Sequence, residues 1–142
     1  MKVAEILKAK GSNVYYVLPN SSVYDALKFM GEKNIGALMV MENDQLKGIF
    51  SERDYARKVV LVNRTSRETM ISEIMTSNVI TVSPSDSIEQ CMELMSGKKI
   101  RHLPVADNNG RVTGLISISD VVTAIIQSQK ETISHLESYI TQ

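Results

Sequence analysis

Two short segments of the sequence place a serine and an aspartate three residues apart, each three residues after a glycine. They are GIFSERD at 48–54 and GLISISD at 114–120. A Ser-x-x-Asp pattern is typical of a helix N-terminus, where the serine caps free backbone N–H groups and an acidic residue favours the first turn. The same end of a helix is also a ready site for an anion. A plain cap and a binding site therefore both stay open, and the duplication of the pattern favours binding.

The residue types in these segments suit a ligand that carries both phosphate and sugar hydroxyls. The serine hydroxyls can donate to phosphate oxygens, and the carboxylates can accept from a ribose diol. The residue before each aspartate is polar as well. The candidate residues are Ser51, Arg53 and Asp54 in the first segment, and Ser117, Ser119 and Asp120 in the second.

The two segments belong to an internal repeat, which constrains the fold more than any local signal. Identities recur 65 residues apart along most of each half, and 66 apart after one extra residue in the turn at 106–111. The first-half residues concerned are Asn13, Val14, Val17, Pro19, Ser22, Met30, Lys33, Leu38 and Val40, followed by Gly48, Ser51 and Asp54. The chain is therefore predicted to contain two copies of one structural unit.

Each half has the pattern of a β-α-β-β-α unit. A β-prone run at 14–18 or 79–82 ends at a proline, and a helix with one apolar stripe follows from the N-cap Ser22 or Ser87. A hairpin comes next, and a second helix starts near Ser51 or near 117–120. We expect an α/β chain of the α+β kind, with repeats at 1–68 and 69–142. Each core would be marginal alone, so a packed pair with pseudo-two-fold symmetry is expected.

The last helix is predicted to extend beyond the repeat. Apolar residues keep one stripe to the end of the sequence: Val121, Val122, Ile125, Ile126, Ile133, Leu136 and Ile140. Such a stripe predicts a helix that covers another surface, either of the same module or of a second chain. A homodimer is expected in either case.

Composition restricts the class of protein. Lys+Arg and Asp+Glu are both 16, and zero net charge argues against a sequence-independent grip on nucleic acid. The single cysteine, Cys91, excludes an internal disulfide and is expected to be buried. No apolar run is long enough for a membrane span, and the start of the sequence does not resemble a secretory signal, so a cytoplasmic protein is expected. Neither a metal site nor a catalytic constellation is predicted.

The paired segments, together with IRHLPVAD (100–107) and ITVSPSDSI (80–88), resemble the cystathionine-β-synthase (CBS) domain, present here as a tandem pair over about residues 12–126. The resemblance implies clefts between the repeats that hold AMP, ADP, ATP, NAD(H) or S-adenosylmethionine, with AMP first among them. It implies that Asp54 and Asp120 bind ribose and that the neighbouring serines and Arg53 face phosphate.

The resemblance also assigns roles outside the two segments. Arg101 and His102 match the basic positions that reach phosphates, whereas the first half has Gly36 and Ala37 there. The adenine is expected against the first strand of each repeat, at Tyr16, Val17, Ile80 and Thr81.

The function expected from these features is regulatory. A nucleotide that prefers one arrangement of the module would shift its population and alter contact with a regulated protein partner, without catalysis. The alternative is an oligomerisation or protein-partner module with no ligand, which the apolar C-terminal stripe favours.

Overall fold

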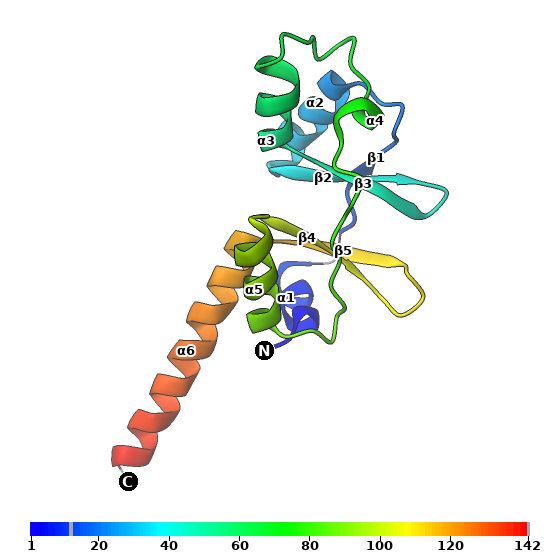
Figure 1. Cartoon of the computed structure of the whole chain (residues 1–142). Helices are drawn as coiled ribbons and strands as arrows, with labels where there is room; N and C mark the ends of the chain where they lie inside the picture. Colours follow the sequence, from blue (N-terminus) through cyan, green and yellow to red (C-terminus); the bar gives the residue numbers. More distant parts are fainter. Residues whose placement is uncertain (12, 142) are drawn as a thin grey trace. The chain divides into compact units, whose positions relative to one another are not determined.

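The computed structural model describes residues 1–11 and 13–141, which form two compact units. The first-repeat unit is Asn13–Ile80, and the second-repeat unit joins residues 1–11 to residues 81–141 (Figure 1). Both contain helices and a small sheet, so the expected α+β class is confirmed. The compact units do not follow the repeat boundaries at 68 and 69. The first-repeat unit extends past that boundary to Ile80, and the second-repeat unit includes the N-terminal residues 1–11.

In the first-repeat unit, three strands form a sheet in the order β1-β2-β3. Strand β1 (Tyr16–Val17) is parallel to β2 (Ala37–Glu42), and β2 is antiparallel to β3 (Gln45–Ser51). The β2–β3 turn has positive φ at Asn43 (54°) and Asp44 (61°), a backbone that gives a tight hairpin with the natural strand twist.

Helix α2 (Val23–Lys33) covers this sheet. It begins where predicted, because the Ser22 side chain accepts a hydrogen bond of 3.0 Å from the Asp25 N–H. It ends at Asn34, which is left-handed (φ 55°). The apolar stripe of α2, the inner face of the sheet and residues from the segment after β3 form one buried cluster: Val23, Ala26, Met30, Leu38, Val40, Phe50, Val59, Ile71 and Ile74.

After β3 the chain forms α3 (Glu52–Tyr55), a π-helical turn η1 (Ala56–Val60) and the short helix α4 (Ile71–Ile74). The segment after α4 then returns to β3, where Ile49 and Thr76 exchange two backbone hydrogen bonds of 2.9 Å. The residues that lead into the second sequence repeat therefore complete the first unit.

The second-repeat unit is built around the hairpin of β4 (His102–Ala106) and β5 (Val112–Ser117). The predicted strand at 79–82 is reduced to a parallel bridge between Val82 and Val105, so this sheet has two strands. Helix α5 (Ile88–Lys98) starts with the predicted capping box of Ser87 and Gln90. Helix α6 (Ile118–Thr141) follows β5 directly.

Helix α1 (Val3–Lys10) belongs to this second unit. Its N-terminus is held by hydrogen bonds of 2.9 Å from Val3 N–H to Asp86 O and from Ala4 N–H to Pro84 O. Val3, Ile6 and Leu7 are buried. The N-terminal segment therefore supplies part of the core around the second hairpin.

Cys91 lies on the buried face of α5, as expected. Burial raises the pKa of its thiol to about 11, and the charges of Asp86 and Glu89 act in the same direction. A thiol in this state packs as a small apolar group.

None of the helices in the described part of the chain is both long and apolar enough to cross a membrane. Over the same residues, no three metal-binding side chains of the His, Cys, Asp or Glu type lie together.

Candidate ligand-binding site

Both Ser-x-x-Asp segments sit at the junction where the second hairpin strand becomes a helix. In the first-repeat unit Ser51 pairs with Ala37 across the hairpin, and the Glu52 N–H donates to Gly36 O at 3.1 Å. In the second-repeat unit Ser117 pairs with His102, and the Ile118 N–H donates to Arg101 O at 2.8 Å. The register therefore makes Arg101 and His102 the structural equivalents of Gly36 and Ala37.

The capping interpretation holds at both junctions. Asp54 Oδ2 accepts from the Ser51 N–H at 3.0 Å, and the Asp54 N–H donates to Ser51 Oγ at 3.2 Å. The corresponding distances for Ser117 and Asp120 are 2.8 and 3.2 Å. Each aspartate thus fixes a helix start, and this fixes the direction in which its carboxylate points.

A lysine completes each junction, and the sequence patterns did not single out either one. Lys58 Nζ lies 3.2 Å from Asp54 Oδ1 and donates to Ile74 O at 3.1 Å. Lys10 Nζ, from α1, lies 2.7 Å from Asp120 Oδ2 and donates to Leu115 O at 2.9 Å. The i, i+4 spacing of Asp54 and Lys58 on a helix was the available signal for the first pair. The second pair spans 110 residues and has no local signal.

The carboxylates of Asp54 and Asp120 differ in how many of their oxygen atoms have a partner. In the first-repeat unit both oxygens of Asp54 have partners. In the second, Oδ2 of Asp120 takes both the Ser117 N–H and Lys10, and within residues 1–11 and 13–141 Oδ1 has no hydrogen-bond donor. The Asp120 side chain retains 22% exposure, and a carboxylate oxygen without a donor can accept from a ligand hydroxyl.

The protonation state of Asp120 allows its carboxylate to accept hydrogen bonds from a ligand. Burial raises its pKa, but the hydrogen bonds from Lys10 and from the Ser117 N–H, with the Lys10 charge, outweigh burial, so the pKa of Asp120 is lowered. The carboxylate is therefore ionised at neutral pH and presents lone pairs only.

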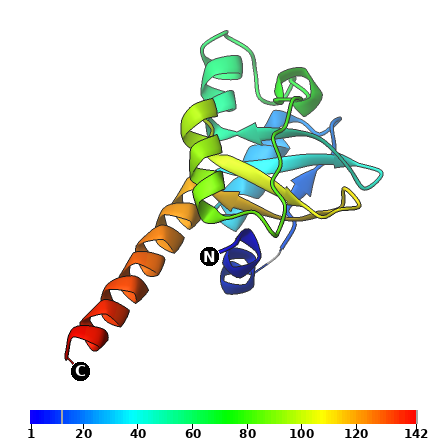
Figure 2. The ribbon, with the colours of Figure 1, turned by 60° about the horizontal axis from the view of Figure 1, so that its bottom comes forward.

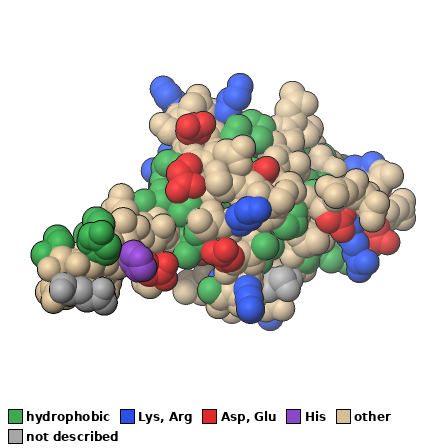
Figure 3. Space-filling view, turned by 90° about the horizontal axis from the view of Figure 1, so that it is seen from below, with side chains coloured by type: hydrophobic (Ala, Val, Ile, Leu, Met, Phe, Trp, Pro, Cys, Tyr) green, Lys and Arg blue, Asp and Glu red, His purple; other side chains and the backbone are tan. Residues whose placement is uncertain are grey.

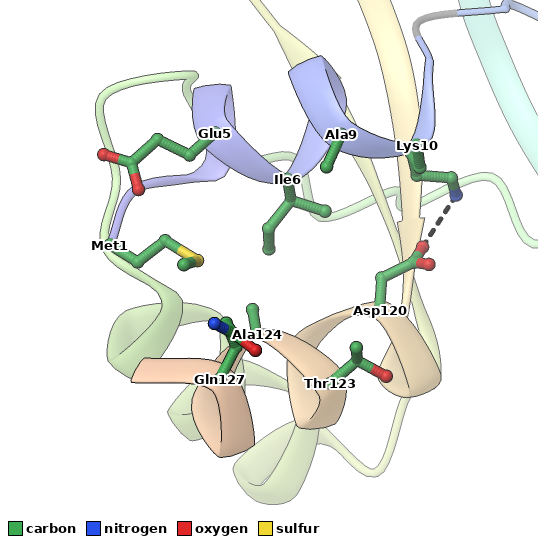
Figure 4. Close-up of a pocket in the computed structure, with 9 residues that line it drawn as sticks. All are labelled: Met1, Glu5, Ile6, Ala9, Lys10, Asp120, Thr123, Ala124 and Gln127. Atoms are coloured by element: carbon green, nitrogen blue, oxygen red, sulfur yellow. Dashed lines mark hydrogen bonds and ion pairs between the residues drawn. The ribbon is translucent and has the colours of Figure 1, made fainter. Parts of the chain in front are cut away.

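A pocket of about 340 Å³ opens beside this carboxylate, between α1 and α6 of the second-repeat unit (Figure 4). Lys10 and Asp120 form its charged end, with Thr123 next to them, and Met1 and Glu5 lie at the other end. Between the ends the lining is Ile6, Ala9, Ala124 and Gln127. An apolar wall with a few polar groups at one end is the usual form of a small-molecule site.

Arg101 and His102 lie beside the junction, with His102 as the first residue of β4 and Arg101 directly before it. Arg101 is exposed and His102 is half-buried. Burial lowers the pKa of His102, the nearby Lys10 and Arg101 lower it further, and Asp120 only partly offsets them. The imidazole is therefore neutral at pH 7, and the positive charge here comes from Arg101 and Lys10 rather than from an Arg–His pair.

The first-repeat unit has a smaller pocket of about 270 Å³ between α2 and the start of its hairpin, at a different place from the Asp120 pocket, and Asp54 does not line it. Its lining includes Gly36 and Glu52, with Leu27, Met30, Gly31, Asn34 and Ile35. Gly36 replaces the arginine of the second unit, and Glu52 adds a negative charge. This pocket is a poor environment for a phosphate.

The remaining predicted site residues are placed as follows. Arg53 and Ser119 are exposed in the first turns of α3 and α6. Tyr16 and Val17 form β1, with Tyr16 51% exposed. Ile80 ends the first-repeat unit and Thr81 begins the main part of the second. None of these side chains lines either of the two pockets.

Comparison with known proteins identifies the family. The CBS domain matches residues 3–61 and 71–127. The CBS domain-containing protein CBSX3 of Arabidopsis thaliana mitochondria is 37% identical over 97% of this chain and 71% of its own length. A signal-transduction protein with CBS domains from Burkholderia ambifaria is 52% identical, with a TM-score of 0.87 over 91% of this chain and 96% of that one.

A second solved structure is that of a relative with bound ligands. The CBS domain pair of protein MJ0100, in complex with 5-methylthioadenosine and S-adenosyl-L-methionine, is 28% identical with a TM-score of 0.78, over 88% of this chain and 99% of that one. The fold and both matched segments thus define a tandem pair of CBS domains. The chain belongs to the CBS domain family, as its paired motifs indicated.

Proposed function

We propose that this chain is a regulatory module that binds an adenosine-containing ligand at the Asp120 pocket of its second-repeat unit. The single observation that carries the proposal is the Asp120 carboxylate, which lines an apolar pocket and of which one oxygen takes the helix cap and Lys10 while the other has no donor among the described residues. The complex of the MJ0100 pair with two adenosine compounds supports this class of ligand.

The size and lining of the pocket fit a nucleoside. Its volume of about 340 Å³ lies near the lower end of the roughly 300–1,000 Å³ typical of small-molecule sites. In this proposal Asp120 Oδ1 accepts from the ribose hydroxyls, and the wall of Ile6, Ala9 and Ala124 receives the adenine ring. The charged end then receives the phosphate or another anionic group.

Lys10 has two roles in this proposal. In the free protein it neutralises Asp120 at 2.7 Å. When a nucleotide enters, the ammonium group turns from Asp120 towards the phosphate, with Arg101 as the second cation. Lys10 is 39% exposed, so the move does not require a buried charge to cross the core. The preferred ligand is AMP, with ADP, ATP, NAD(H) and S-adenosylmethionine as the other candidates.

Calorimetric titration with these five ligands tests the proposal, and the two junctions provide a matched pair of variants. Asp120→Asn should weaken AMP binding by about 10- to 100-fold, the value of one hydrogen bond to a charged acceptor. Asp54→Asn, at the equivalent cap, should change it by less than about threefold. Lys10→Met should weaken AMP more than adenosine, because adenosine has no phosphate.

Three results would contradict the proposal: no binding tighter than millimolar for any of the five ligands, an Asp120→Asn variant that binds like the wild type, or equal effects at Asp54 and Asp120. Conversion of the bound nucleotide, followed by chromatography, would contradict a purely regulatory role. Binding is expected to act by linkage on a protein partner, since a ligand that prefers one conformation shifts the population towards it.

A further inference from the structure

Helix α6 carries a row of exposed apolar side chains that the ligand site does not use. These side chains are aliphatic, yet between 41% and 80% of each residue's surface is exposed to solvent. The row is Val122, Ile126, Ile133, Leu136 and Ile140, with the polar Gln129 between its two parts. Steps along the row are four, three, four, three and four residues. This spacing is the heptad pattern of a coiled coil, with an average step of about 3.5 residues.

The row lies apart from the face that α6 uses inside its own unit. Val121 and Ala124 are the buried residues of α6, and from Gln129 to Thr141 every residue is exposed. Figure 2 shows the C-terminal part of α6 leaving the unit, and Figure 3 shows apolar side chains at the surface of that projecting end. A projecting helix of this length is marginal in water unless its apolar face is covered.

The residue types along the row favour pairing with an identical helix. Ile126, Ile133 and Ile140 take the a positions, and Val122 and Leu136 take d positions. Isoleucine at a with leucine at d favours two parallel strands. Gln129 also takes a d position, and one polar residue in such a core fixes the register because it pairs with itself.

No other helix of the described chain offers a complementary row. Helices α2 and α5 have 11 residues each, and their apolar stripes are buried in their own units. We infer that α6 pairs with the α6 of a second copy of this chain, as a parallel, in-register, two-stranded coiled coil. The interface runs from Val122 to Ile140.

Charges beside the row agree with the parallel register. In the parallel, in-register pair the e position of one helix faces the preceding g position of the other. Lys130 then lies against the partner's Ile125 and Glu137 against the partner's Thr132, so no like charges meet. The antiparallel register that keeps every apolar layer places Lys130 against the partner's Lys130. The antiparallel register that joins Lys130 to Glu137 leaves Val122 and Ile126 outside the overlap.

A designed cysteine tests the orientation in the full chain. Gln129→Cys should form a disulfide-linked dimer in a glutathione buffer, because equivalent d positions face each other only in the parallel pair. Glu131→Cys, on the outer face of the same turn, should remain unlinked. The natural Cys91 is buried, so it should not form a disulfide in the folded protein. Failure of Gln129→Cys to link, or equal linking of both variants, would overturn the parallel arrangement.

Sedimentation equilibrium tests the interface itself. The double variant Ile133→Asp/Leu136→Asp changes only exposed side chains, so each chain should still fold, while self-association should weaken by at least about 100-fold. Ser138→Asp, on the outer face, is the matched control and should dimerise like the wild type. A monomeric wild type at micromolar concentration would overturn the inference, and so would a dimer that the double variant leaves intact.

This result is separable from the ligand proposal. Asp120→Asn should dimerise normally, and the Ile133→Asp/Leu136→Asp variant should still bind AMP, because the pocket and the exposed row lie on different faces of α6. Loss of dimerisation in Asp120→Asn would count against the assigned interface.

Discussion

Replacing Gly48 by alanine should lower the free energy of unfolding more than the same change at Gly31, Gly97 or Gly114. An added Cβ at Gly48 would lie 2.7 Å from Met75 Sδ and 2.8 Å from Thr76 O. Thr76 O is a backbone atom, and it accepts the hydrogen bond from the Ile49 N–H at 2.9 Å. It therefore cannot withdraw without loss of the bridge that holds the segment after α4 on β3.

Gly114, the counterpart in the second repeat, has a softer environment. Its added Cβ would meet Leu7 Cδ2 at 2.7 Å and Leu7 Cδ1 at 3.3 Å, and both atoms are the end of a flexible side chain. Overpacking of a core costs about 1–3 kcal/mol, and the loss of one backbone hydrogen bond adds about 1 kcal/mol. We expect a loss in free energy of unfolding of about 2–4 kcal/mol for Gly48→Ala and about 1 kcal/mol for Gly114→Ala.

Two helical glycines give the matched controls. Gly31 in α2 and Gly97 in α5 have nothing within 4 Å of an added Cβ. Alanine there should stabilise by about 0.5–1 kcal/mol, because glycine loses more backbone entropy on folding. Urea unfolding followed by circular dichroism measures all four variants. The reasoning is refuted if Gly48→Ala is as stable as the wild type, or if Gly114→Ala costs more than Gly48→Ala.

Three further predictions use the caps and the titrating groups. Ser87→Ala should lower the free energy of unfolding by about 1 kcal/mol, since the Gln90 N–H loses its acceptor; an unchanged urea midpoint would contradict this. Cys91 should stay unmodified by a thiol reagent at pH 8 until the protein unfolds, because burial raises its pKa to about 11; rapid labelling of the native protein would show that the site is open. The lowered pKa of His102 means that folding favours its neutral form, so its contribution is complete above 6.5 and stability falls as pH drops below that value. His102→Gln should remove this fall in urea titrations between pH 7 and 5, and an identical pH profile would exclude His102 as its source.

The sequence predicted most of the local structure because the signals involved are local. The N-caps at Ser22 and Ser87, the two hairpins and the starts of α3 and α6 all depend on residues within a few positions of one another. The repeat then supplied the order of elements twice. The capping geometry of both Ser-x-x-Asp segments followed for the same reason.

The parts that sequence reasoning missed depend on distant segments. Nothing near Lys10 indicates that it will meet Asp120, 110 residues later, because the contact exists only once α1 has packed against the second hairpin. The strand predicted at 79–82 became a single bridge at Val82, since β propensity cannot say whether a partner strand is within reach. The neutral state of His102 likewise comes from burial and from a lysine of another segment.

These differences bear on what the duplicated motif means. Ser-x-x-Asp contributes a helix cap at both junctions, so its presence in both repeats needs no ligand at either. A binding site needs more than the cap, namely an uncommitted carboxylate oxygen, an apolar wall and a nearby cation. The second-repeat unit has all three at Asp120, whereas Asp54 is committed to Lys58 and to the cap beside Gly36. Symmetry of the motif therefore does not predict symmetry of binding, and one occupied site on the second-repeat unit is the expected stoichiometry.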